Sequence, residues 1–142
     1  MRQPEFYAAV YGIIRNAEWN VLAVKRKDTG YLDWWYGLPA GHVEGTEELT
    51  ESIQREILEE VWLHVDTAAL RLIHTRHRVD KDRIYFDFFF EVLTYSWTPT
   101  NTEPDKSEDI FWISPNEEKF QSRIILEKIK NVETFSEINL RS

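Results

Sequence analysis

The 142-residue sequence has no cysteine, which excludes a disulfide framework and any thiolate chemistry. It has no apolar run near the ~18 residues that a membrane-spanning helix needs. The N-terminal residues MRQPEF also lack the apolar core of a signal peptide. We therefore expect a cytoplasmic protein with no membrane partner.

Positive charge is in deficit. The sequence has 17 Lys and Arg residues and 25 Asp and Glu residues, which give a formal net charge of −8. A protein that wraps duplex nucleic acid needs a basic footprint, so that function class is excluded. An acidic chain that handles an anionic polyphosphate must neutralise it locally, and metal ions are the obvious means.

The rest of the composition is that of a globular protein. Hydrophobic residues make up 42% of the chain and aromatic residues 14%, enough for a core. No internal repeat and no Pro-, Gly- or Ser-rich linker divides the sequence. We expect a single domain over residues 1–142, and a homodimer is compatible with this composition.

One segment carries the clearest helical pattern. Leu49, Ile53, Ile57 and Val61 recur at every fourth position, which predicts one buried stripe of an α-helix. A short loop with Gly41 and Gly45 precedes it. The pattern predicts a glycine loop that leads into an amphipathic helix.

Three acids on this helix predict a cation site. Glu56, Glu59 and Glu60 share a face, with Glu60 inside the apolar arc and Glu56 at its edge. Carboxylates so placed repel one another and lose hydration, so they need a positive partner. Mg²⁺ suits them because it prefers oxygen ligands. The alternative is a solvated acidic face, since Glu is an ordinary helix former.

The spacing of the whole stretch resembles the Nudix box, G-x5-E-x7-R-E-U-x-E-E-x-G-U, where U is bulky and aliphatic. Gly41 is followed after five residues by Glu47 and after seven more by Arg55-Glu56-Ile57-x-Glu59-Glu60. The preceding Gly37-Leu38-Pro39-Ala40 also looks like the usual lead-in. One position departs, because Trp62 stands where the box has a glycine. That glycine would end the helix in a left-handed conformation, which costs another residue about 1–2 kcal/mol.

The resemblance implies a Nudix-like fold, an α+β sandwich with a mixed sheet between helices. It implies hydrolysis of a nucleoside diphosphate linked to another group, with Mg²⁺ or Mn²⁺ as the cofactor. Glu56, Glu59 and Glu60 would be metal ligands together with the carbonyl of Gly41, and Glu56 is also a candidate for the catalytic base.

Two further residues of the box have supporting roles. Arg55 lies one turn before Glu59 and is expected to orient it by a charge-assisted hydrogen bond. Glu47, at the helix start, would hold Arg55. The loop acids Glu103, Glu108 and Asp109 are candidates for an extra metal or water ligand, and the alternative for each is a solvated loop position.

The substrate is less tightly defined. The chain lacks the Pro or Tyr near Arg78–Lys81 that would mark an ADP-ribose or dinucleoside polyphosphate enzyme. Small size and the Glu103-Pro104-Asp105-Lys106 loop favour a (deoxy)nucleoside triphosphate, cleaved to a monophosphate and pyrophosphate. The alternatives are a nucleoside diphosphate sugar and a non-catalytic nucleotide-sensing module.

Residues outside the box must read the nucleotide. One of Trp34, Trp35 and Tyr36 is expected to stack on the base, with Trp35 preferred to Trp34. Arg78 and Asp87 are further candidates, and core packing or solvation is the alternative reading for all of these positions.

The remaining pattern predicts strands and a second helix. The strands are expected over Phe6–Arg15, Val21–Lys25, Ala69–Arg78 and Ile84–Tyr95. The first two are expected to form a hairpin, and the last, apolar on both faces, to lie centrally. Ser114-Pro115-Asn116-Glu117 predicts the start of a helix that runs to about Lys130. Residues 131–142 predict no element.

Overall fold

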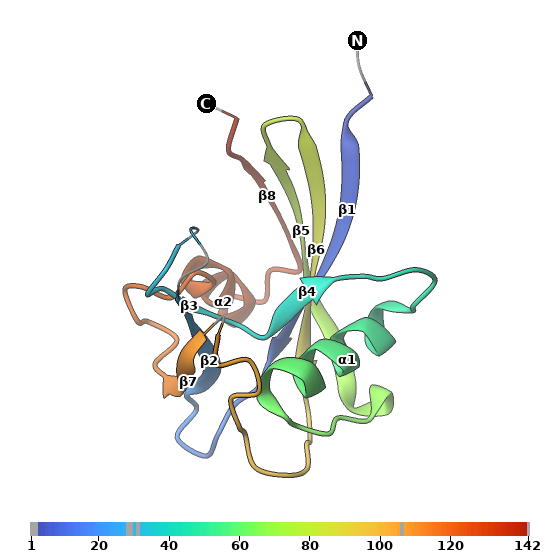
Figure 1. Ribbon diagram of the computed structural model, residues 1–142. Coiled ribbons are helices and arrows are strands. Elements are labelled where there is room, and N and C mark those ends of the chain that lie inside the picture. Colours follow the sequence, from blue (N-terminus) through green and yellow to red (C-terminus); the bar gives the residue numbers. More distant parts are fainter. Residues whose placement is uncertain (1–2, 28–29, 31, 106, 142) are drawn as a thin grey trace.

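Two β-sheets form the framework of the computed structural model, which describes residues 3–27, 30, 32–105 and 107–141. The larger sheet has the strand order β4-β1-β6-β5-β8, and the smaller has the order β3-β2-β7 (Figure 1). The strands are β1 (Glu5–Ile13), β2 (Val21–Arg26), β3 (Tyr36–Gly37), β4 (Ala40–His42), β5 (Leu70–Asp80), β6 (Arg83–Val92), β7 (Ser107–Ile113) and β8 (Phe135–Asn139). The helices are α1 (Leu49–Val61), the short 3₁₀ helix η1 (Thr67–Ala69) and α2 (Arg123–Lys130).

Strand β6 lies at the centre of the larger sheet, as its apolar sequence predicts. It pairs in parallel with β1, from Glu5 opposite Arg83 to Ile13 opposite Glu91. On its other side it pairs antiparallel with β5 through a two-residue turn. The sheet is therefore mixed, and the predicted α+β class is confirmed.

The two helices cover opposite sides of this framework (Figure 1). On one side Ile53, Ile57 and Val61 of α1 are fully buried in a cluster with Val10 and Phe90 of the larger sheet. Burial of each such side chain contributes about 1.5–3 kcal/mol. Within the described ranges, neither helix is long and apolar enough to cross a bilayer.

A second cluster forms under α2. Ile125 and Leu126 of this helix pack with Phe120, with Phe89 of β6 and with Ile13 of β1. The predicted mixed sheet between helices is thus confirmed, because each helix buries its apolar residues against strands.

The predicted hairpin of the first two strands is wrong. Strand β2 pairs with β3 and β7, and only the bridge between Arg15 and Val21 joins it to the β1 side. Val21, Leu22 and Ala23 are all buried, so this strand is covered on both faces. The buried backbone N–H and C=O groups of such a strand need partners at both edges, and the local pattern does not say which segments supply them.

The predicted start of the second helix is also wrong, since α2 begins at Arg123 instead of Pro115. Ser114 forms only a local turn, in which its Oγ accepts the N–H of Asn116 at 3.1 Å. The following segment pairs with Tyr36, whose N–H donates to Lys119 O and whose carbonyl accepts the N–H of Gln121, both at 2.9 Å. These tertiary hydrogen bonds compete with helical ones and delay the helix.

The C-terminal segment forms a strand that the sequence did not predict. Strand β8 adds in parallel to the edge of β5, with Thr75 opposite Phe135. Buried His74 fixes the segment, because its Nδ1 lies 2.8 Å from Glu133 O and its Nε2 lies 2.8 Å from Ser136 Oγ. This edge strand becomes one wall of the cavity described below.

Candidate metal and diphosphate site

The carboxylate of Glu56 on α1 lies against the backbone of Gly41 on β4. A Cβ atom built on Gly41 would stand less than 3.0 Å from all three atoms of the Glu56 carboxylate group. Gly41 therefore keeps the strand backbone in contact with this carboxylate. Gly41 was expected in a loop, but it lies in strand β4, and it serves the site through this close approach.

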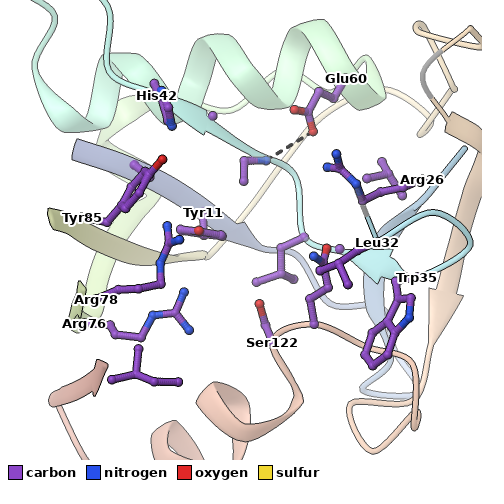
Figure 2. Close-up of a pocket in the computed structure, with 18 of the residues that line it drawn as sticks. Tyr11, Arg26, Leu32, Trp35, His42, Glu60, Arg76, Arg78, Tyr85 and Ser122 are labelled. Atoms are coloured by element: carbon purple, nitrogen blue, oxygen red, sulfur yellow. Dashed lines mark hydrogen bonds between the residues drawn. The ribbon is translucent and has the colours of Figure 1, made fainter. Parts of the chain in front are cut away.

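Glu60 is directed inward, in keeping with its place in the apolar arc. Its Oε2 accepts the N–H of Ala40 at 3.3 Å, the contact drawn as a dashed line in Figure 2. Burial and the nearby charge of Glu56 raise the pKa of the Glu60 carboxyl well above its usual value. Burial also raises the pKa of Glu56, although the Arg55 guanidinium opposes this effect. Two acids with raised pKa values thus stand side by side.

Arg55 links the acids of the segment. Its Nε donates to Glu47 Oε2 at 2.7 Å, and its Nη1 donates to Glu56 Oε1 at 2.8 Å and to Glu59 Oε2 at 3.2 Å. The hydrogen bond from Arg55 lowers the pKa of Glu47 to about 2. Glu47 thus anchors the guanidinium that reaches Glu59.

The end of α1 brings another acid to the site. Thr100 N–H donates to Val61 O at 2.8 Å, and the Thr102 hydroxyl donates to the carbonyl of Glu59. These bonds satisfy carbonyls that a helix end leaves open. They also place Glu103 close enough for its charge to raise the pKa of Glu60 further. The last turn of α1 holds no basic residue, so the negative end of the helix dipole adds to the negative potential around Glu60.

The three candidate loop acids therefore differ in position. Glu103 lines the cavity with Glu60. Asp109 is exposed, outside the cavity lining, and its Oδ1 accepts the N–H of Ile110 at 2.8 Å. Glu108 belongs to β7, and its side chain lies outside the described residues.

A cavity of about 640 Å³ opens beside the acids. Glu60 stands on one side, Arg76 and Arg78 stand across the cavity, and Trp35 borders a third side (Figure 2). Its volume lies within the usual range for small-molecule sites. The cavity thus joins an acidic, a basic and an aromatic wall.

Of the three neighbouring aromatic residues, Trp35 alone lines this cavity within the described chain. Trp34 is half exposed and has a positive φ of 69°. Tyr36 packs edge-on against Phe111 with ring centroids 5.7 Å apart. The preference for Trp35 over Trp34 matches this placement, whereas Tyr36 is a packing residue.

Arg78 lines the cavity, and Asp87 lies behind it. The Asp87 side chain is fully buried and is bound by the guanidinium groups of Arg76 and Arg78. Asp87 therefore positions arginines and does not itself meet the cavity. Arg76 joins Arg78 at this wall, because residues two apart on one strand share a face.

The lining includes other residues that the sequence did not single out. They are Tyr11, Arg26, Leu32, His42, Tyr85, Ser122 and Ile138 among others. They come from five different strands and from the segments that precede β3 and α2. No local pattern relates such segments, so their convergence is visible only in the fold.

The donor set suits a hard divalent cation. Across residues 3–27, 30, 32–105 and 107–141, no three acidic or imidazole side chains are gathered as a ready metal cage. The carboxyl groups of Glu56 and Glu60 interact directly and form an adjacent pair, although Arg55 donates to both Glu56 and Glu59. Mg²⁺ fits such a pair because it uses one or two carboxylates and fills its shell with water and phosphate oxygens.

Comparison with known proteins agrees with this architecture. The family model described as the NUDIX domain matches residues 5–131. The MutT NUDIX hydrolase from Burkholderia pseudomallei is 22% identical, with a TM-score of 0.69 and coverage of 79% of this chain and 85% of that one. The MutT protein from Methanosarcina mazei Go1 is 18% identical, with a TM-score of 0.75 and coverage of 92% and 97%.

A third structure widens the range of relatives. The bifunctional NMN adenylyltransferase/ADP ribose pyrophosphatase from Francisella tularensis is 19% identical, with a TM-score of 0.67 and coverage of 93% of this chain and 42% of that one. No curated protein matches the chain in a sequence search. Because the family model covers most of the sequence, the chain belongs to the NUDIX family of hydrolases, enzymes that cleave acid anhydrides.

Proposed function

We propose that this hydrolase is metal-dependent and cleaves a nucleoside diphosphate linked to another group, with a (deoxy)nucleoside triphosphate as the leading candidate. The products would be a nucleoside monophosphate and pyrophosphate. The observation that carries the proposal is the meeting of Glu56, Glu60 and Glu103 with the Gly41 backbone at one wall of a nucleotide-sized cavity.

The proposed metal ligands are Glu56, Glu59 and Glu60 with the Gly41 carbonyl, and Glu103 is available as a further acid. Bound Mg²⁺ or Mn²⁺ would supply charge neutralisation and polarise the diphosphate. Burial, followed by repulsion from neighbouring acids, raises the pKa values of Glu56 and Glu60, and this supports the assignment because a bound cation stabilises the charged carboxylates.

The protein side chains have distinct proposed roles. Glu56 takes the proton from a water molecule that attacks phosphorus, and the anhydride P–O bond breaks as the new P–O bond forms, which separates the monophosphate from pyrophosphate. Arg55 holds Glu56 and Glu59 in place through the hydrogen bonds described above. Trp35 stacks on the base, which stabilises binding by about 1–3 kcal/mol.

The test is a screen of nucleoside triphosphates and nucleoside diphosphate sugars with Mg²⁺ or Mn²⁺, followed by pyrophosphate and monophosphate detection. We expect metal-dependent release of pyrophosphate from at least one triphosphate. Faster turnover of a nucleoside diphosphate sugar than of every triphosphate would overturn the leading candidate and keep the reaction type.

Variants of the acids test the metal site. Glu59→Gln and Glu60→Gln should each reduce turnover by more than tenfold while circular dichroism shows an intact fold, because each removes a charged ligand and no apolar packing. Glu118→Gln is the control, since Glu118 is an exposed turn residue outside the cavity lining. Turnover within tenfold of the parent for both Glu59→Gln and Glu60→Gln would refute the assignment.

A further inference from the structure

Behind one cavity wall lies a buried ion cluster that the hydrolytic role does not use. Asp87 of β6 is fully buried, while the side chains of Arg76 and Arg78 on β5 keep 16% and 17% exposure. Arg76 Nε and Arg78 Nε each donate to Asp87 Oδ2 at 2.9 Å, and Arg78 Nη2 donates to Oδ1 at 3.0 Å. We refer to Arg76 and Arg78 as the arginine pair.

The carboxylate of Asp87 has no acceptor capacity left for a ligand. Besides the three guanidinium donors it accepts the hydroxyl of Tyr11 at 3.4 Å, and a carboxylate offers about four acceptor sites. The arginine pair still has donors in excess. Within the part of the chain that the structure describes, Nη1 of Arg78 and both Nη atoms of Arg76 have no acceptor.

The arginine pair is held in a fixed orientation. The guanidinium of Arg78 lies 3.9 Å from the ring centroid of Tyr85, and that of Arg76 lies 5.4 Å from the ring centroid of Phe89. Two guanidinium charges face a single carboxylate, and arginine does not lose its proton in a protein. A half-buried excess of one positive charge in a chain of net charge −8 indicates an acceptor-rich ligand.

We propose that the arginine pair is a donor-only subsite for the end of the substrate remote from the diphosphate. It would bind a group that presents hydrogen-bond acceptors and no donor. The inference rests on the proposed function, because the carboxylates define where the diphosphate lies. Figure 2 shows the arginine pair across the cavity from Glu60, and therefore apart from that diphosphate.

Two kinds of substrate group have this chemistry. The O6 and N7 edge of guanine presents two acceptors, which suit a guanidinium. A phosphate on the sugar presents acceptors with negative charge. Adenine places an amino donor beside N7, so its edge would face the arginine pair with one mismatched group.

Binding without metal tests the subsite apart from catalysis. The probes are GMP, AMP, adenosine 3′,5′-bisphosphate and inorganic phosphate, each measured by isothermal titration and by the shift in Tm. We expect GMP or the bisphosphate to bind at least about tenfold more tightly than AMP. Tighter GMP identifies the base edge as the ligand, and tighter bisphosphate identifies the second phosphate.

Variants assign the preference to the arginine pair. Arg76→Ala and Arg78→Ala should remove the preference over AMP. Arg71→Ala is the matched control, because Arg71 lies on the same strand, pairs with Glu91 and stays outside this cavity. Arg78→Lys keeps the charge if an alanine variant fails to fold, and it should lose a preference for GMP because an ammonium cannot form the bidentate contact.

Equal affinity of the parent for GMP, AMP and the bisphosphate would overturn the inference. A preference over AMP that survives in both Arg76→Ala and Arg78→Ala would also overturn it. So would a preference for GMP that survives in Arg78→Lys. Inorganic phosphate as the only probe that responds would also overturn it, since no substrate end would then be selected. Failure of the proposed function has a different signature, namely a binding preference without hydrolysis of any nucleotide.

Discussion

The backbone of Gly41 touches the carboxylate of Glu56, and a single added methyl group would overlap it. Gly41→Ala must therefore displace Glu56 or separate β4 from α1. We expect turnover to fall by at least about tenfold while the fold survives, because small displacements of catalytic groups are costly. Steady-state kinetics with a circular dichroism check would measure this.

A double variant tests whether that loss acts through Glu56. In the Gly41→Ala/Glu56→Gln protein, the glycine substitution should add little to the loss caused by Glu56→Gln alone. Fully multiplicative losses would show that Gly41 acts on the site by another route.

The stability of the metal-free protein should depend on pH through Glu56 and Glu60. Their pKa values are raised from 4.5 in the folded state, so the folded protein holds protons that the unfolded chain releases. The free energy of unfolding therefore decreases as pH rises from about 4.5 through the raised pKa values. Since Mg²⁺ or Mn²⁺ can replace those protons, its stabilising shift in Tm should be larger at pH 8 than at pH 5.

Thermal melts of the parent and of Glu60→Gln with and without metal would check this expectation. The amide has no charge to relieve, so both the pH dependence and the metal shift should shrink in the variant. An equal metal shift at pH 5 and pH 8 in the parent would contradict the argument. Glu47 changes the free energy of unfolding in the opposite direction. Its pKa is lowered to about 2 in the folded state, so its contribution to stability is present above about pH 4.5 and is lost as pH falls below that value.

Trp62 ends α1 in the left-handed conformation, with φ 57° and ψ 41°, at the position where the box has glycine. Its indole stacks on Trp97 with ring centroids 5.4 Å apart and stays 48% exposed. Loss of about 100 Å² of buried surface and of the stack would cost about 3 kcal/mol, against about 1–2 kcal/mol of relieved strain. We expect Trp62→Gly to lower the free energy of unfolding by about 1–2 kcal/mol.

Urea denaturation of Trp62→Gly and Trp62→Ala would measure the two contributions. The alanine variant loses the stack and keeps the left-handed strain, so it should be the less stable of the two. A glycine variant more stable than the parent would show that strain outweighs packing at this helix end.

Trp35→Ala should raise KM for a triphosphate by about ten- to a hundredfold, because a stacked base contributes about 1–3 kcal/mol. The metal requirement should stay unchanged, since Trp35 lies apart from the acids (Figure 2). Trp34→Ala is the comparison, and we expect a KM within twofold of the parent. Less than a twofold change for both variants would place base recognition elsewhere.

The sequence was sufficient for the parts of this fold that depend on local periodicity. Helix α1 with its acids and the central strand β6 were predicted because their patterns are set by neighbours along the chain. The fixed spacing from Gly41 to Glu60 likewise identified the acidic wall of the cavity.

Non-local pairing explains what the sequence missed. The partners of β2, the late start of α2 and the edge strand β8 all depend on hydrogen bonds to distant segments. Asp87 was read as a substrate contact because an acid on a strand gives no sign of the two arginines that bury it. The cavity wall that holds the arginine pair forms only when β5, β6 and β8 are paired in register.

The parallel pairing of β5 with β8 has a consequence for how the protein assembles. Ile138 and Leu140, near the end of the chain, line the cavity, and Glu5 and Val21 near its beginning pair with Arg83 and Ile113. Loop closure over such separations slows folding relative to a helical bundle of similar length. During synthesis, the acids of α1 face an incomplete cavity wall until β8 has left the ribosome and paired with β5.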